Sequence, residues 1–174
     1  LCETELFFEG ILREDRSVLE FLDADYTYLN QQLATHYGIS GVKGDEFRRV
    51  WLHGTPRGGL LTQASILTLT SNPTRTSPVK RGKFVLENIL ATPPPAATAD
   101  VQLLEEGSHK KIEGTLRERF QAHRADPSCA GCHAMMDPLG FAFENFDAVG
   151  AWRTADDGLP IDASGKLVSG EAFK

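Results

Sequence analysis

Five consecutive residues, Cys129-Ala130-Gly131-Cys132-His133, constrain this chain more than any other feature of its sequence. They form the C-x-x-C-H pattern of covalent c-type haem attachment. Two cysteines three residues apart lie on one side of a helical turn, so both sulfurs reach the two vinyl groups of one porphyrin. The next residue then points its imidazole at the iron from the proximal side. The motif therefore predicts one covalent haem c, with Cys129 and Cys132 as thioethers and His133 on the iron.

Three other interpretations of the same residues stay open. A zinc site needs a fourth ligand, and the sequence lacks a second cysteine pair. A thioredoxin-type redox pair expects a βαβ context that the sequence pattern does not indicate. A plain disulfide or structural pair is the third. The chain has three cysteines in all, too few for a disulfide scaffold, and Cys2 is left outside the motif.

The composition excludes several classes of protein. Of the 174 residues, 41% are hydrophobic and 24% are charged, which argues against disorder along the whole chain. The 18 Lys and Arg against 24 Asp and Glu give a net charge of −6, so nucleic-acid binding is not expected. No apolar run approaches the roughly 20 residues that span a bilayer, so no membrane insertion is expected. The acidic balance suits a basic redox partner at low salt.

Hydrophobic spacing and Pro/Gly punctuation divide the chain into four segments. Residues 1–56 form a helical N-terminal segment, 57–92 a helical segment packing on the haem, 93–113 a Pro-rich linker, and 114–174 the haem-attachment region. The expected fold class is mainly α: a small helical c-type cytochrome-like domain with irregular loops. A short C-terminal β-hairpin is expected around Ser164-Gly165.

Helix boundaries follow from capping signals. A helix is expected to begin at Asp25, because Tyr26, Leu29, Leu33 and Tyr37 keep the spacing of one helix face, and to end at Gly38. Ser77 and Pro78 predict another helix start, as N-cap and first helical residue, and Asp126-Pro127 predicts one just before the motif.

Several separate stretches resemble a known family. They are Arg57-Gly58-Gly59-Leu60-Leu61-Thr62-Gln63-Ala64-Ser65, Thr70 to Gly82 with its Ser-Asn-Pro-Thr-Arg-Thr-Ser-Pro loop, Cys129 to Phe141, and Glu144-Asn145-Phe146-Asp147. From Arg57 to Phe173 the chain resembles domain of unknown function 1588, found in planctomycete-type multi-domain c-type cytochromes. Residues 3–56, with Asp25 to Asn30 and His36-Tyr37-Gly38, resemble the C-terminal end of domain of unknown function 1592, which usually precedes it.

The resemblance carries expectations about cofactor, location and partners. It implies haem c, a periplasmic or otherwise exported location, and a place in a longer protein. It implies as partner a redox protein or other domains of the same polypeptide. It implies no particular substrate. The chain begins without Met or a signal peptide, so we expect it to be a piece of a longer or processed protein.

The sixth position of the iron is less constrained by sequence. Met135 and Met136 follow His133 so closely that a continuing helix keeps them on the proximal side, where Met136 is expected to pack at the haem edge. His36 is the first choice as distal ligand, with a helix C-cap as its alternative role. An open or water-filled position is the other possibility. His53, His109 and His123 are further candidates with weaker arguments.

Other side chains are candidates for contact with the porphyrin. Arg75, inside an irregular loop, is the first choice to neutralise a propionate, followed by Lys80, Arg81 and Arg153. A solvated surface charge is the alternative for each of these cations. Phe141 is expected to wall the porphyrin or to fill core, as are Phe143, Phe146 and Trp152.

These expectations lead to two hypotheses of function. The first is a monohaem c-type cytochrome domain that transfers single electrons within a larger exported redox protein. The second is a haem enzyme or a gas or peroxide sensor with an open distal position. The choice depends on the sixth ligand, and the sequence favours an electron-transfer protein over a catalyst without deciding between them.

Overall fold

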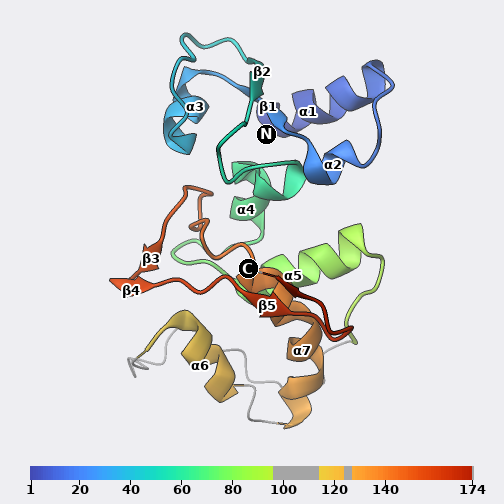
Figure 1. The fold of residues 1–174 in the computed structure, drawn as a ribbon, viewed down its shortest axis with the longest axis vertical. Helices are drawn as coiled ribbons and strands as arrows, with labels where there is room; N and C mark the ends of the chain where they lie inside the picture. Colours follow the sequence, from blue (N-terminus) through green and yellow to red (C-terminus); the bar gives the residue numbers. More distant parts are fainter. Residues whose placement is uncertain (96–113, 124–126, 174) are drawn as a thin grey trace. The chain divides into compact units, whose positions relative to one another are not determined.

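The computed structural model describes residues 1–95, 114–123 and 127–173 (Figure 1). The chain divides into two compact units. Unit 1 comprises Leu1–Arg75 and Phe146–Trp152, and unit 2 comprises Thr76–Asn145 and Arg153–Lys174. The chain thus passes from unit 1 to unit 2, returns to unit 1 for seven residues, and ends in unit 2. In the described ranges, no helix is both long and apolar enough to cross a membrane.

Unit 1 combines short helices with one two-stranded sheet. Its helical elements are α1 (Cys2–Arg13), α2 (Glu20–Asp23), α3 (Gln31–Tyr37), η1 (Leu60–Thr62) and α4 (Ala64–Leu69). Its strands β1 (Tyr26–Leu29) and β2 (Arg48–Trp51) pair antiparallel, with Tyr26 opposite Trp51 and Leu29 opposite Arg48. Two clusters of buried side chains fill the unit: Phe7, Ile11, Ala24 and Tyr26 form one, and Leu29, Ala34 and Tyr37 form the other.

A carboxyl group is buried beside these apolar clusters. Glu3 on α1 is 3% exposed and accepts hydrogen bonds from the hydroxyls of Tyr37, at 2.6 Å, and Thr27, at 2.7 Å. The Tyr37 hydroxyl also accepts a hydrogen bond from the Ala64 amide at 2.7 Å. Burial raises the pKa of Glu3 above its ordinary value of 4.5, and the two hydroxyl donors oppose that shift. The folded chain therefore binds a proton at Glu3 more tightly than the unfolded chain does.

The helix expected to begin at Asp25 starts later. Tyr26–Leu29 is strand β1, and Asn30 caps α3 by accepting a hydrogen bond from the Leu33 amide at 2.9 Å. Helical spacing was a weak guide here because the aromatic and β-branched run Tyr-Thr-Tyr-Leu also suits a strand, and β2 supplies its partner. The predicted end at Gly38 is confirmed, since that residue adopts the left-handed conformation at φ 71°.

Unit 2 is organised around two helices. It contains α5 (Pro78–Phe84), continued by a π-helical turn, η2 (Val85–Ile89), and then α6 (Leu116–His123) and α7 (Pro127–Phe141). The Ser77 hydroxyl accepts a hydrogen bond from the Lys80 amide at 3.3 Å and Pro78 opens α5, so that predicted cap is confirmed. Two small antiparallel pairs complete the unit: β3 (Ala155–Asp156) with β4 (Leu159–Pro160), and β5 (Gly165–Lys166) with β6 (Ala172–Phe173).

Helices α5 and α7 approach each other backbone to backbone. A methyl group added at Gly82 on α5 would overlap the Met136 carbonyl of α7, and one added at Gly140 on α7 would overlap the Pro78 carbonyl of α5. Each helix thus presents a glycine to the main chain of the other. This close approach positions the segment of α7 from residue 136 to 140.

The expectation of a mainly α fold is wrong. The described residues form seven short α-helices together with three two-stranded antiparallel sheets, a mixed architecture without a clear mainly α class. The predicted hairpin turn at Ser164-Gly165 is also misplaced, because Gly165 lies within strand β5. The β3–β4 turn instead uses Asp157 and Gly158, both at positive φ, as Asp-Gly turns between strands do. Frequent Gly and Pro, 16 and 9 residues, keep the elements short.

The four predicted segments, 1–56, 57–92, 93–113 and 114–174, stay a prediction. Most of the 93–113 linker and residue 126 of the predicted Asp126-Pro127 helix start lie outside the described residues. Helix α7 does begin at Pro127.

Substituting Glu3 should change how stability depends on pH. Because the pKa of Glu3 is raised in the folded state, the folded chain binds the proton more tightly, and its stability falls as pH rises above about 4.5. We expect Glu3→Gln to flatten this decline, measured as the thermal unfolding midpoint across pH 4 to 8. Glu5→Gln, on the exposed side of the same helix, is the matched control and should keep the wild-type slope. Equal slopes for Glu3→Gln and wild type would contradict the assignment.

Two glycines of α7 should respond oppositely to alanine. Gly140→Ala forces a methyl group against the Pro78 carbonyl and should lower the free energy of unfolding by about 1–3 kcal/mol or more. Gly131→Ala, whose added methyl meets nothing within 4 Å, should raise it by up to about 1 kcal/mol through helix propensity. Denaturant unfolding followed by circular dichroism measures both, and a stability loss of the same size in both variants would refute the close approach.

Candidate functional site

The C-x-x-C-H motif lies on the first turns of α7. The side chain of Cys129 is not among those the structure describes. Cys132 is half-buried and a free thiol, with its Sγ 4.0 Å from the Pro95 carbonyl oxygen. At 100° per residue, positions 129, 132 and 133 fall within about 100° of one helix face. Helix α7 thus places the two cysteine positions on one side, with the histidine position beside them.

A buried carboxylate holds the imidazole of the motif. The Nδ1 atom of His133 lies 2.8 Å from Oδ1 of Asp137, one helical turn further along α7. The Asp137 side chain is 1% exposed and the His133 side chain 12% exposed. A carboxylate oxygen accepts, so Nδ1 carries the proton and donates it, and the lone pair of the ring is on Nε2. The ring is therefore set in the tautomer that ligates a metal through Nε2.

Aromatic side chains line the same region of unit 2. The Phe120 ring of α6 meets the His133 ring edge to face at a centroid distance of 6.3 Å, and meets Phe141 at 5.5 Å. Phe141 is 2% exposed and packs under the Arg117 guanidinium, 4.5 Å from the ring centroid. Phe120 thus links the motif histidine to the far end of α7.

The predicted contact residues Met136 and Phe141 both lie on α7. Met136 is buried, at 7% exposure, and its backbone carbonyl faces Gly82 of α5. Phe141 ends the helix, two turns beyond His133. Met136 and Phe141 therefore belong to the buried core of unit 2, the unit that also contains His133.

A charged network closes the C-terminal end of α7. Arg81, buried on α5, donates to the Phe143 carbonyl at 2.7 Å and lies 3.5 Å from Glu144. Glu144 also accepts from Thr76 at 2.7 Å and from Arg153 at 3.1 Å. Burial raises the pKa of Glu144, while the Thr76 hydroxyl and the two guanidinium groups oppose the shift. Arg81 and Arg153, candidates for propionate contact from sequence, are thus engaged with a carboxylate of the protein.

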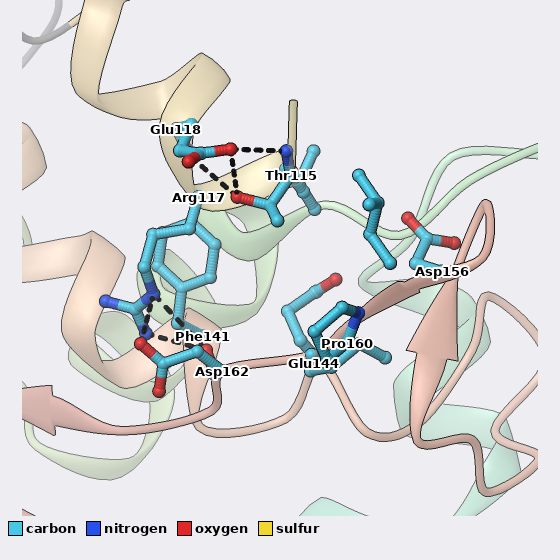
Figure 2. A pocket seen from close by; sticks show the side chains of 11 residues that line it. Thr115, Arg117, Glu118, Phe141, Glu144, Asp156, Pro160 and Asp162 are labelled. Carbon is cyan, nitrogen blue, oxygen red and sulfur yellow. Dashed lines mark hydrogen bonds and ion pairs between the residues drawn. The ribbon is translucent and has the colours of Figure 1, made fainter. Parts of the chain in front are cut away.

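A cavity of about 320 Å³ opens between α6, the end of α7 and the β3–β4 pair (Figure 2). Figure 2 shows Arg117 bonded to Asp162 on one side and Glu118 bonded to Thr115 on another. Phe141 and Glu144 form part of its wall. Neither this cavity nor the larger one of about 820 Å³ in unit 1 is lined by Cys132 or His133. The 320 Å³ cavity therefore lies at the end of α7 away from the motif.

Two predicted site residues belong to unit 1 and not to the unit of the motif. His36, in the last turn of α3, is exposed, and its Nε2 lies 2.8 Å from the Val149 carbonyl oxygen. Ligation through Nε2 would break that bond, and the distal role of His36 stays a prediction. Arg75 is exposed, and its carbonyl accepts a hydrogen bond from the Asn72 amide at 2.9 Å, so its propionate role also stays a prediction.

The remaining histidine candidates are distributed along the chain. His53 stacks on Trp51 in unit 1, at a centroid distance of 5.7 Å and an interplanar angle of 1°. His109 lies outside the described residues, and the side chain of His123 on α6 is not described. Among the side chains that the structure describes, no three His, Cys, Asp or Glu converge as a metal-ion site.

The sequence predicts a short helix from Thr115 to about His123, and α6 confirms it, but sequence reasoning missed Asp137 and the capping box at the start of α6. Asp137 follows His133 by four residues, the helical spacing at which side chains meet, and that signal was available in Cys-His-Ala-Met-Met-Asp. Thr115 and Glu118 form a capping box, in which Glu118 accepts from the Thr115 amide at 2.7 Å and lies 3.0 Å from its hydroxyl. These hydrogen bonds lower the pKa of Glu118.

Two family models match the chain. The first, PSCyt3, described as a protein of unknown function (DUF1588), matches residues 57–156. The second, PSD4, described as a protein of unknown function (DUF1592), matches residues 1–39. These are the two families that the sequence resemblance indicated, and that prediction is confirmed. No curated protein and no solved structure matches the chain.

Proposed function

The chain belongs to the DUF1588 family of proteins of unknown function, and on that premise we propose that it is a monohaem c-type cytochrome domain that transfers single electrons. Matches to two families in one chain indicate a multi-domain protein. The proposal places this domain in an exported protein, where its partner is a redox protein or another domain of the same polypeptide.

One observation carries the proposal. Positions 129, 132 and 133 lie on one face of one helix, and the His133 imidazole is fixed through Nδ1 by Asp137. A histidine that ligates a metal through Nε2 commonly donates its other ring N–H in this way. A thioredoxin-type pair or a structural disulfide gives no reason for an oriented imidazole next to the second cysteine.

The donor set fits a c-type haem better than a zinc ion. Cys132 is a free, half-buried thiol, and its neighbour His133 is oriented by a carboxylate. A closed zinc site requires four converging ligands, and the sequence offers no second cysteine pair to complete one. The fit is that of two thiols and one imidazole presented in sequence along a helix.

The chemistry asked of the chain is small. Cys129 and Cys132 would hold the haem: each thiol would add across one vinyl group, forming a C–S bond and giving its hydrogen to the neighbouring vinyl carbon, with no oxidant consumed. His133 would ligate the iron through Nε2. Bound haem c supplies an iron that takes up and returns one electron. Phe120, which packs edge to face on the His133 ring, excludes water from that side of the imidazole.

Covalent haem attachment tests the proposal directly. We expect the chain, made in a host with c-haem maturation, to keep one haem after denaturation, measured by intact mass and haem staining. Cys129→Ala/Cys132→Ala should lose covalent haem because no thiol remains to form a thioether. Cys2→Ala, which removes an exposed cysteine of unit 1, is the matched control and should keep it. A wild-type chain without covalent haem, or a double variant that retains it, would defeat the proposal.

Absorption spectra test the electron-transfer role separately. The surroundings of the distal position decide between electron transfer and binding of small molecules. For electron transfer we expect low-spin spectra that do not change when CO is added to the reduced protein. High-spin spectra with CO binding would favour an enzyme or a sensor and would contradict simple electron transfer.

A further inference from the structure

We propose that Asp137 is a positioning residue that lowers the reduction potential of the haem through the imidazole of His133. The inference rests on the proposed function and deepens it, because it assigns the direction in which the protein sets the potential. Neither family match nor the C-x-x-C-H pattern assigns a role to this carboxylate.

Helix α7 places Asp137 within hydrogen-bond distance of His133. Asp137 Oδ1 accepts the Nδ1 hydrogen of His133 at 2.8 Å, within the range of charge-assisted hydrogen bonds. Both side chains are on one face of α7, four residues apart, so the helix itself sets their separation. The contact needs no distant loop to form.

The stretch of α7 around Asp137 is held in place by α5. The backbone of α7 is in contact with α5 on both sides of Asp137, through Met136 against Gly82 and through Gly140 against Pro78. Asp137 therefore lies in a stretch of α7 that is held against α5 on both sides. A carboxylate held in this way orients the imidazole more firmly than a side chain on a free surface.

The negative charge of Asp137 acts on His133 in a buried environment. The Asp137 side chain is 1% exposed and that of His133 is 12% exposed, so solvent and salt screen the interaction weakly. A carboxylate that accepts from Nδ1, on the side of the imidazole ring away from the iron, raises the basicity of Nε2 as a ligand. A more basic ligand and a nearby negative charge both favour the ferric state, which carries one more positive charge than the ferrous state. Both effects lower the potential.

An ordinary structural role is the competing explanation. A His–Asp pair four residues apart can serve only to stabilise a helix. The two roles differ in what they predict for the haem, since a purely structural pair affects unfolding and leaves the potential of folded protein unchanged.

The experiment compares variants that all carry haem. Asp137→Asn keeps the size and one acceptor oxygen and removes the charge. We expect the preference for the ferric over the ferrous form to fall about tenfold, an increase of ~59 mV in a spectroelectrochemical titration. Asp137→Glu, which keeps the charge, should lie closer to wild type. The matched control Asp157→Asn removes the same charge from an exposed residue of unit 2 whose positive φ suits Asn.

The outcomes separate the inference from the proposed function. A potential for Asp137→Asn no higher than that of Asp157→Asn, with haem covalently bound in both, overturns the positioning role and leaves the cytochrome proposal standing. Absence of covalent haem from wild type overturns both.

A measurement on wild type covers the case in which Asp137→Asn does not fold. In reduced protein with 15N-labelled histidine, the Nδ1 proton of His133 should exchange with solvent at least tenfold more slowly than a ring N–H proton of His53, whose side chain is 72% exposed, because it is buried in a hydrogen bond. Exchange as fast as at His53 would refute the bond and with it the inference.

Discussion

The contact between the backbones of α5 and α7 is the constraint on which unit 2 depends. Gly82 and Gly140 admit a main-chain approach that any larger residue would block. On α7 these contact points are Met136 and Gly140, and between them lies Asp137, which accepts a hydrogen bond from the motif histidine. The chemistry of the motif is therefore supported by a feature without a functional group, the absence of two side chains.

Each unit also buries a carboxyl group among polar partners. In unit 1, Glu3 has two hydroxyl donors. In unit 2, Glu144 forms ion pairs with Arg81 of α5 and with Arg153. Arg153 is the first residue of unit 2 after the seven residues that belong to unit 1. Removing one partner from such a network leaves a desolvated polar or charged group, which costs far more than the net contribution of the intact contacts. These networks specify which segments pack together, a task that small apolar clusters leave under-determined.

Local signals in the sequence predicted local structure well and pairing poorly. The cap at Ser77-Pro78 and the helix end at Gly38 are decided within a few residues, and both are present. Strand β1 was mistaken for helix because its identity depends on β2, some 20 residues away, and no local pattern encodes that partner.

The same limit applies to the candidate site. The motif itself is contiguous and was evident, and the i,i+4 partner Asp137 was within reach of the same reasoning. The contact of Met136 with Gly82 of α5 joins residues 54 apart in the sequence and that of Phe120 with the His133 imidazole residues 13 apart, so only the folded chain reveals them. The hairpin was misplaced because Asp157-Gly158, a strong turn signal, was passed over for Ser164-Gly165.

The path of the chain between the units bears on how such proteins are assembled in evolution. The DUF1588 match starts at Arg57, yet Arg57 is buried in unit 1, where its guanidinium lies 3.6 Å above the Tyr37 ring and donates to the carbonyls of Thr62 and Gly150. Tyr37 belongs to the stretch matched by DUF1592. The boundary between the two families therefore runs through one hydrophobic and polar core. Recombination at that boundary would divide a folding unit, so the two families are expected to be inherited as a pair and not exchanged as independent modules.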